Sequence, residues 1–276
     1  MEKPIVSSFS NPLVKQVRAL HKKKARLESG LFLVEGIHHI GEAVSAGWEL
    51  DSVIYAPDVL TSEFARDLIA RLPLKPQPVS TQVMDSLADK ENPQGILAVV
   101  HQREIQLDSF HLPAQSQTQA RAKCVALVSP QDPGNVGTIL RTMDAVGADA
   151  LFLLNPSDGS RGSVELYHPT VIRSSMGTLF WKPVVQASFG EFLGWARQRD
   201  YQLIGTSAHG DVEYQTFVPN MPWILVLGNE QKGLSPEQSR ACDVTVSLPM
   251  RGRVSSLNLA VAAGVLLYQY VNQAED

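Results

Sequence analysis

The sequence predicts an α/β protein, with a mostly parallel sheet in the C-terminal half of the chain and a small α/β unit before it. Two observations lead to this fold class. From residue 124 onward, short apolar segments alternate with segments whose apolar residues recur at helical spacing. This alternation is typical of parallel strands covered by helices on both faces. The chain of 276 residues, 44% of them hydrophobic and 19% charged, is also long enough to bury a large core.

The first hundred residues predict the small α/β unit. Residues 31–36, 52–56 and 95–100 have the composition of strands, and residues 38–47 and 62–72 have helical spacing. The segment after them is rich in Gln and Ser and has weak periodicity, which is typical of a linker. The predicted organisation is therefore an N-terminal domain at 1–101, a linker at 102–122 and a C-terminal domain at 123–276.

The C-terminal domain alternates between strands and helices along its whole length. The predicted strands are 124–129, 150–155, 201–207, 223–228 and 244–249. The predicted helices are 136–148, 169–177, 191–199, 235–242 and 255–271. The last helix is apolar on all sides, which predicts burial against the other domain or another subunit.

Composition excludes several classes of protein. No signal-peptide pattern opens the chain, and the longest apolar run, Leu257–Val271, is too short to span a bilayer, so we expect a cytoplasmic protein without a membrane contact. Cys124 and Cys242 lie far apart in apolar contexts, which favours reduced, buried thiols. The seven histidines show no HxxxH or Cys/His pairing, so we expect no metal site.

The net charge of −4 hides an uneven distribution. Residues 1–30 carry seven Lys and Arg side chains against two acidic ones, so the basic N-terminal arm precedes an acidic remainder. Clustered Lys and Arg favour contact with a polyanion such as nucleic acid. The alternative is a solvated helix face, and the charge pattern leaves both open.

Polar residues follow three of the predicted strands at their carboxyl ends, where ligands bind in parallel sheets. After the strand at 124–129, Asn135 is a candidate helix cap, and Arg141 follows six residues later. Six residues are about 1.7 helical turns, so the two side chains face one site only if Asn135 lies in the loop before the helix. The alternative is a helix cap and a separate surface arginine.

The strand at 223–228 leads into Gly228, Glu230 and Gly233. The two glycines have the spacing of a Walker A phosphate loop, but Leu234 stands where that loop needs lysine, which argues against a nucleotide hydrolase. No GxGxxG motif follows a strand, and no acidic residue lies at the expected distance after such a motif. Both absences argue against a dinucleotide-dependent dehydrogenase. A carboxylate and a glycine turn at this strand end therefore indicate a different ligand.

Polar groups also follow the last predicted strand. Ser255 and Ser256 are candidate N-caps of the final helix, and Asn258 falls in its first turn. Taken alone, this is a capped core helix. Together with the polar residues after the two earlier strands, it gathers side chains with no evident packing role at one edge of the sheet.

Three segments carry a resemblance to a known family. NVGTILRTMDAVGAD, LVLGNEQKGLS and LPMRGRVSSLNLAVAAG resemble motifs one, two and three of the SpoU (TrmH-type) RNA 2′-O-ribose methyltransferases of the SPOUT superfamily. The resemblance covers residues 124–271 in the family's order. The front part, FSNPLVKQVRALHKKKARLESGLFLVEG, is similar to the substrate-binding domain of the ribosomal-RNA branch.

The resemblance implies a fold, a cofactor and a reaction. The C-terminal segment is expected to thread through a loop and form a deep trefoil knot, and the protein is expected to be a homodimer through that region. The implied reaction is methyl transfer from S-adenosylmethionine to a ribose 2′-hydroxyl, with 23S ribosomal RNA as the favoured substrate. The alternatives are transfer RNA as substrate, or a catalytically inactive RNA-binding module of the same fold.

The resemblance also assigns residues. Backbone groups of the knot loops are expected to bind the cofactor, and glycine at 228 would let the backbone approach it closely. The expected cofactor-binding residues are Thr206, Ala208, Gly228, Leu248 and Leu257. The expected catalytic residues are Arg141, Asn135, Glu230, Ser256 and Asn258.

Arg141 is implied to activate the 2′-hydroxyl, but a guanidinium stays protonated in proteins. Arg141 is therefore either a base in an unusual environment or a fixed cation that stabilises the developing alkoxide or the neighbouring phosphate. Glu230 is expected to orient the arginine or a nearby helix end.

Two segments are expected to contact RNA. The first lies in the basic arm and comprises Lys22, Lys23, Lys24 and Arg26. The second is RSSMGTLF, where Arg173 and Ser175 match an arginine- and serine-containing segment of the family near the target nucleotide. For this second segment, an ordinary helix with an exposed arginine stays an equal alternative.

Overall fold

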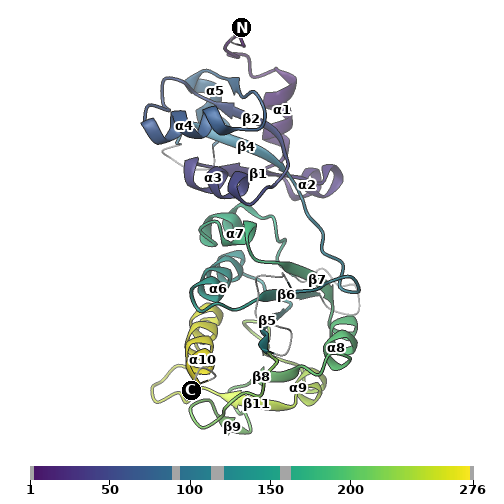
Figure 1. The fold of residues 1–276 in the computed structure, drawn as a ribbon. Helices are drawn as coiled ribbons and strands as arrows, with labels where there is room; N and C mark the ends of the chain where they lie inside the picture. Colours follow the sequence, from purple (N-terminus) through teal and green to yellow (C-terminus); the bar gives the residue numbers. More distant parts are fainter. Residues whose placement is uncertain (1–2, 89–93, 113–120, 156–162, 274–276) are drawn as a thin grey trace. The chain divides into compact units, whose positions relative to one another are not determined.

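The computed structural model describes residues 3–88, 94–112, 121–155 and 163–273. Within it the chain forms two compact units: unit 1 comprises Met1–Arg103 and Tyr167–Trp181, and unit 2 comprises Glu104–Leu166 and Lys182–Asp276 (Figure 1). Part of the predicted linker, residues 113–120, lies outside the described residues. No helix in the described ranges has both the length and the apolar character needed to cross a membrane.

Unit 1 is built on a four-stranded sheet in the order β1-β4-β2-β3. β4 runs antiparallel to β1 and to β2, and β3 runs parallel to β2. The strands predicted at 31–36, 52–56 and 95–100 are confirmed as β1, β2 and β4. The strands are β1 (Leu31–Glu35), β2 (Leu50–Tyr55), β3 (Gln77–Pro78) and β4 (Ile96–His101), and the helices are α1 (Pro12–Ala19), α2 (Lys23–Ser29), α3 (Ile37–Ser45), α4 (Glu63–Arg71), α5 (Thr81–Asp85) and α7 (Pro169–Ser174).

The segment 167–181, which carries α7, reaches unit 1 from the C-terminal half of the sequence. Aromatic contacts anchor it: the Tyr167 ring lies 4.5 Å from Phe32 and 6.2 Å from Trp48, and the Phe180 ring lies 5.3 Å from Trp48. The Trp48 indole N–H donates to the Phe180 carbonyl at 2.9 Å. Buried rings with a satisfied N–H hold this segment firmly.

Unit 2 contains a seven-stranded sheet in the order β7-β6-β5-β10-β8-β11-β9, and every neighbouring pair is parallel. The predicted parallel α/β fold is therefore confirmed, while the trefoil knot stays a prediction. The strands are β5 (Lys123–Val128), β6 (Ala150–Asn155), β7 (Val184–Ser188), β8 (Gln202–Thr206), β9 (Val212–Glu213), β10 (Trp223–Leu227) and β11 (Val244–Ser247), and the helices are α6 (Pro133–Ala145), α8 (Phe189–Arg197), α9 (Pro236–Ala241) and α10 (Leu259–Gln273).

Two strands of unit 2 were missed in the sequence. β7 and β9 lie at the two edges of the sheet, and each pairs with one neighbour only. Their segments are short and carry polar residues, so pairing with β6 and β11 decides their conformation rather than local pattern.

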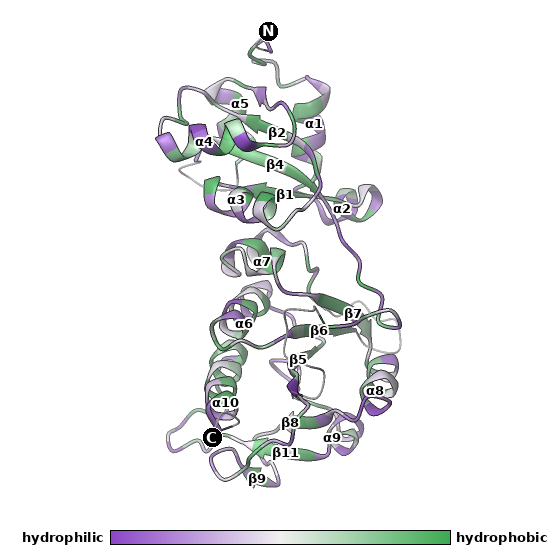
Figure 2. Cartoon of the chain, viewed as in Figure 1, coloured by the Kyte–Doolittle hydropathy of each residue, from purple (hydrophilic) through white to green (hydrophobic). Residues whose placement is uncertain are grey.

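Helices cover both faces of the unit 2 sheet, as predicted. α6 and α10 pack together on one face, and α8 and α9 lie on the other (Figure 1). Figure 2 shows that α10 is mostly green and white, whereas α8 mixes green with purple. α10 is not buried on all sides within one chain, because Val261, Val265 and Tyr268 on one of its faces are exposed.

Part of the predicted linker belongs to the core of unit 2. Leu107 and Phe110 are buried there, and the Phe110 ring lies 5.8 Å from Phe152 and 5.9 Å from Trp195. Residues 104–112 of the predicted linker therefore belong to unit 2. Weak periodicity failed to reveal them, because the apolar side chains of this segment, Ile105, Leu107, Phe110 and Leu112, follow neither helical nor strand spacing throughout.

Candidate functional site

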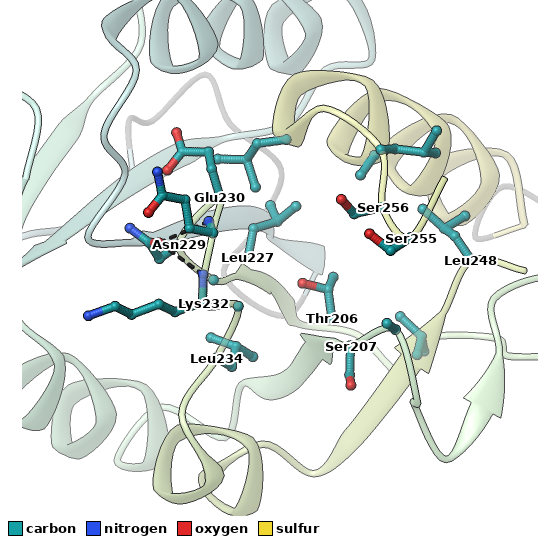
Figure 3. A pocket seen from close by; sticks show the side chains of 18 of the residues that line it. Thr206, Ser207, Leu227, Asn229, Glu230, Lys232, Leu234, Leu248, Ser255 and Ser256 are labelled. Atoms are coloured by element: carbon teal, nitrogen blue, oxygen red, sulfur yellow. Dashed lines mark hydrogen bonds between the residues drawn. The ribbon is translucent and has the colours of Figure 1, made fainter. Parts of the chain in front are cut away.

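A cavity of about 420 Å³ opens beside the carboxyl ends of β8, β10 and β11 (Figure 3). Its walls combine apolar side chains with serine and threonine hydroxyls. All five residues predicted to bind the cofactor lie in these walls: Thr206, Ala208, Gly228, Leu248 and Leu257. These residues come from three loops, and the first and last of them, Thr206 and Leu257, are 51 positions apart in the sequence. The loops meet because parallel strands end at the same edge of the sheet.

The loop after β10 folds back on itself. The Asn229 N–H donates to the Gly233 carbonyl at 3.2 Å, and the Gly233 N–H donates to the Asn229 carbonyl at 2.8 Å. A Cβ atom at Gly228 would lie 2.2 Å from the Gly233 carbonyl carbon, which no side chain tolerates. Closure of the loop itself therefore requires glycine at this position. The expected close approach of a cofactor to Gly228 stays a prediction.

Glu230 receives hydrogen bonds from the start of α6. Its carboxylate accepts from the backbone N–H of Gln131 at 2.9 Å and of Asp132 at 3.1 Å, and from Asn135 Nδ2 at 3.1 Å. Of the two expected roles of Glu230, the geometry matches orientation of a helix end. A carboxylate is also favourable at a helix N-terminus, where backbone N–H groups lack partners.

Asn258 continues this chain of hydrogen bonds. Its Nδ2 donates to Asn135 Oδ1 at 2.9 Å, and its Oδ1 accepts from the N–H groups of Ala260 and Val261. Asn258 is therefore the cap of α10, which begins at Leu259. The expectation that Ser255 and Ser256 cap this helix is wrong, although both line the cavity.

Arg141 does not join this group within one chain. Asn135 is the third residue of α6, capped by Asp132, so Asn135 and Arg141 lie on different sides of the same helix. Asn135 is buried, whereas Arg141 is exposed and does not line the cavity. Asn135 therefore does not lie in the loop before the helix, and the condition under which it and Arg141 would face one site is not met.

Asn229 is a site residue that sequence reasoning missed. Its Nδ2 donates to the Ser129 carbonyl at 2.9 Å, and its Oδ1 accepts from the N–H groups of Gln231 and Lys232. Ser129 has a positive φ of 50° at the end of β5. The amide thus ties the loop after β10 to the loop after β5. The available signal was an asparagine between Gly228 and Glu230, a residue type that hydrogen-bonds nearby backbone.

The predicted RNA-binding residues divide into exposed and buried ones. Lys22, Lys23 and Lys24 are exposed on and before α2, whereas Arg26 is 2% exposed and donates from Nη1 to the carbonyls of Leu20 and His21. Arg26 stabilises the turn between α1 and α2. The expectation that it contacts RNA is therefore wrong.

The second predicted RNA segment divides in the same way. Arg173 is half-buried, and Ser175 is 0% exposed and donates its hydroxyl proton to the Ile172 carbonyl. The expectation that Ser175 contacts RNA directly is wrong, because its side chain is enclosed within unit 1. No group of three or more His, Cys, Asp and Glu side chains suited to a metal occurs in the described residues.

Family models match both parts of the chain. Residues 122–268 match the SpoU rRNA Methylase family, and residues 11–98 match the MRM3-like substrate binding domain. The chain belongs to the SpoU rRNA methylase family. Motifs two and three of this SpoU protein contribute residues to the cavity walls, and motif one contributes Asn135, which is hydrogen-bonded to Glu230 and Asn258. The resemblance drawn from the three motifs is confirmed.

Relatives of this SpoU protein are named rRNA methyltransferases. A 23S rRNA (uridine(2479)-2′-O)-methyltransferase of Streptomyces viridochromogenes is 34% identical, over 92% of this chain and 87% of the relative. The 23S rRNA (guanosine(2553)-2′-O)-methyltransferase RlmP of Bacillus subtilis is 29% identical, over 95% and 97%. The crystal structure of an AdoMet-bound rRNA methyltransferase from Sinorhizobium meliloti superposes with a TM-score of 0.83 at 32% identity, over 99% of this chain and 97% of that one.

Proposed function

We propose that this protein transfers a methyl group from S-adenosylmethionine to a ribose 2′-hydroxyl of 23S ribosomal RNA. The observation that carries the proposal is the hydrogen-bonded series Glu230, Asn135 and Asn258, which joins the ends of β10, α6 and α10 beside the cavity. Relatives over nearly the whole chain are named 23S rRNA 2′-O-methyltransferases, which favours this substrate over transfer RNA and over an inactive binding module.

The cavity fits S-adenosylmethionine in size and chemistry. About 420 Å³ lies within the range of small-molecule sites, and its lining is partly apolar, as an adenine ring requires. Backbone groups at Thr206, Ala208, Gly228, Leu248 and Leu257 would hold the cofactor, which supplies an electrophilic methyl group. Asn135, Glu230 and Asn258 would hold the loops beside the cavity in fixed positions through their hydrogen bonds.

The bound cofactor would supply the methyl carbon. The ribose oxygen would form a bond to this carbon as the carbon–sulfur bond breaks, and the hydroxyl proton would pass to solvent water. A fixed guanidinium stabilises the oxygen as negative charge develops on it. We assign that role to Arg141. Because Arg141 does not line the cavity of its own chain, it would act on the cavity of a second copy.

A homodimer through α10 supplies that second copy. Val261, Val265 and Tyr268 are spaced at i, i+4 and i+7 and form an exposed apolar stripe, with Leu257 exposed just before it. Arg141 lies on α6, which packs against α10. A partner seated on this stripe would bury the apolar side chains and bring Arg141 close to the other cavity.

Within this proposal, residues 1–101 bind RNA, residues 123–276 carry out methyl transfer, and both work in the cytoplasm on ribosomal RNA. The segment 167–181, although it lies in the second range, adds to unit 1.

The experiment is transfer of a labelled methyl group from S-adenosylmethionine to ribosomal RNA and, separately, to transfer RNA. Label at one ribose that resists alkaline cleavage, present in ribosomal RNA and absent with Arg141→Ala, would support the proposal. A mixture of Arg141→Ala with a variant defective in the cavity should regain activity, because one of its two sites would be intact. Label in transfer RNA alone would overturn the substrate, and no cofactor binding would overturn the enzyme.

A further inference from the structure

One indole side chain in unit 1 is held in place without being buried. Trp181 is 52% exposed, whereas the other three tryptophans are at most 8% exposed. Its Nε1–H donates to Glu42 Oε2 at 2.6 Å. The hydrogen bond sets the orientation of the ring and leaves much of the ring surface in contact with solvent.

Glu42 is itself fixed from the opposite side. A Cβ atom at Gly177 would lie 2.6 Å from Glu42 Cγ, and Gly177 has a φ of 91°, so the Glu42 side chain packs directly against a backbone turn that favours glycine. Glu42 Oε1 also lies 3.9 Å from His38 Nδ1. Glu42 is therefore a fixed support for the indole.

Two further residues lie close to this support. Met176 is 47% exposed and has a φ of 52°, and its carbonyl accepts a hydrogen bond from His38 Nε2 at 3.2 Å. His38 is also exposed. Trp181 and His38 thus both lie against Glu42, and Met176 is joined to His38 through its carbonyl, all within unit 1.

We propose that Trp181, with Met176 and His38, forms a stacking site for an unpaired base of the RNA substrate. Single-stranded RNA is bound by aromatic side chains on which splayed bases stack, and a pre-oriented ring loses little entropy in doing so. The inference rests on the proposed function. The position of Trp181 supports RNA as the ligand, because the segment 167–181 packs into unit 1, whose residues 11–98 match a substrate binding domain. The segment itself lies outside the matched range.

The test measures binding of two labelled RNAs by fluorescence anisotropy at one fixed salt concentration. The first probe is a single-stranded oligoadenylate, and the second is a duplex RNA of equal length, which offers no unpaired base. Trp181→Ala should weaken binding of the single strand about tenfold and leave the duplex nearly unchanged. Trp181→Phe should retain most of the affinity, because a ring that stacks is still present.

Glu42 provides a second pair of variants. Glu42→Gln keeps an oxygen that accepts from the indole N–H, so single-strand binding should persist. Glu42→Ala removes the support and should weaken binding with Trp181 still present. Phe64→Ala is the matched control, because Phe64 on α4 is another exposed aromatic residue of unit 1.

The outcomes separate this inference from the function beneath it. Equal single-strand affinity of Trp181→Ala and wild type, with methyl transfer intact in both, would overturn the stacking site alone. A change in oligomeric state without a change in RNA affinity would overturn it in favour of a protein contact. If wild type binds neither RNA nor S-adenosylmethionine, both proposals fail.

Discussion

Asn135 on α6 donates a hydrogen bond to Glu230 on the loop after β10 at 3.1 Å, although 95 positions separate the two residues. Asn135 Oδ1 then accepts from Asn258, which lies 123 positions from Asn135 along the chain. One buried amide therefore connects the three loops whose residues line or flank the cavity. Disturbing this amide or its partners should affect cofactor binding and catalysis together.

Glu230→Ala should lower methyl transfer about 100-fold, because the start of α6 loses its carboxylate acceptor and shifts. The free energy of unfolding should fall by about 1–3 kcal/mol, the range for hydrogen bonds to a charged group. Both quantities are measured by methyl-transfer kinetics and urea denaturation. Glu237→Gln, an exposed acid on α9, is the control, and equal activity of the two variants would contradict the prediction.

Asn258 has two separable tasks, one for each side-chain atom. Asn258→Asp keeps the oxygen that caps α10 but loses the N–H groups that bond Asn135, so activity should fall while stability persists. Asn258→Ala loses both, and the free energy of unfolding should fall by about 1 kcal/mol more than in the Asp variant. Thermal denaturation beside methyl-transfer assays separates the tasks. Full activity of the Asp variant would mean that the bond to Asn135 has no part in catalysis.

Gly228→Ala should abolish binding of S-adenosylmethionine and cost about 1–3 kcal/mol of stability, because its Cβ would collide with the backbone at Gly233. Gly233→Asn is the matched control. Gly233 has a φ of 66° with open space around it, a conformation that asparagine tolerates. Isothermal titration calorimetry should detect cofactor binding in the Asn variant alone. Normal binding by Gly228→Ala would show that the loop can open without loss of the site.

Replacing Lys22, Lys23 and Lys24 by alanine should weaken RNA binding and flatten its dependence on salt. Every lysine that neutralises a phosphate should account for about 1 unit in the slope of log affinity against log salt. The measurement is RNA affinity at several salt concentrations. The control is the double variant Arg66→Ala and Arg71→Ala on α4, which removes positive charge from the same unit at a different place. An unchanged slope in the lysine variant would place these lysines on a solvated helix face.

Stability should fall at alkaline pH because of one buried thiol, Cys124, and one partly buried thiol, Cys242. Burial raises the pKa of Cys242 to about 12, and burial also raises the pKa of Cys124. Unfolded thiols ionise near about pH 8.5, so the contribution is complete below that pH and is lost as pH rises toward the folded pKa. In that window each thiol should reduce the free energy of unfolding by about 1.4 kcal/mol per pH unit.

Urea denaturation between about pH 8 and about pH 11 checks this slope. In Cys242→Ala the free energy of unfolding should fall less steeply with pH, because only one thiol still contributes to the slope. A denaturation midpoint that stays constant over this range in wild type would show that both thiols ionise as easily in the folded protein as in the unfolded one.

Local patterns in the sequence were enough for much of the fold. Apolar runs ending in Gly228 or followed by Asn135 identified the central strands β5 and β10, because a strand buried on both faces must be apolar throughout. The same patterns located the loops that carry the cofactor-binding residues, since parallel strands end at one edge of the sheet. The edge strands β7 and β9 were missed, because their conformation depends on a neighbour and not on their own composition.

Only the tertiary structure decided which polar residues are buried, which are exposed and which are hydrogen-bonded to one another. Whether Asn135 lies in a loop or inside α6, whether Arg26 and Ser175 reach solvent, and why position 228 requires glycine all depend on atoms that are distant in sequence. Residue type and spacing set which hydrogen bonds a segment is able to make. The order of strands in the sheet brings the partners together, and that order is a property of the packed core as a whole.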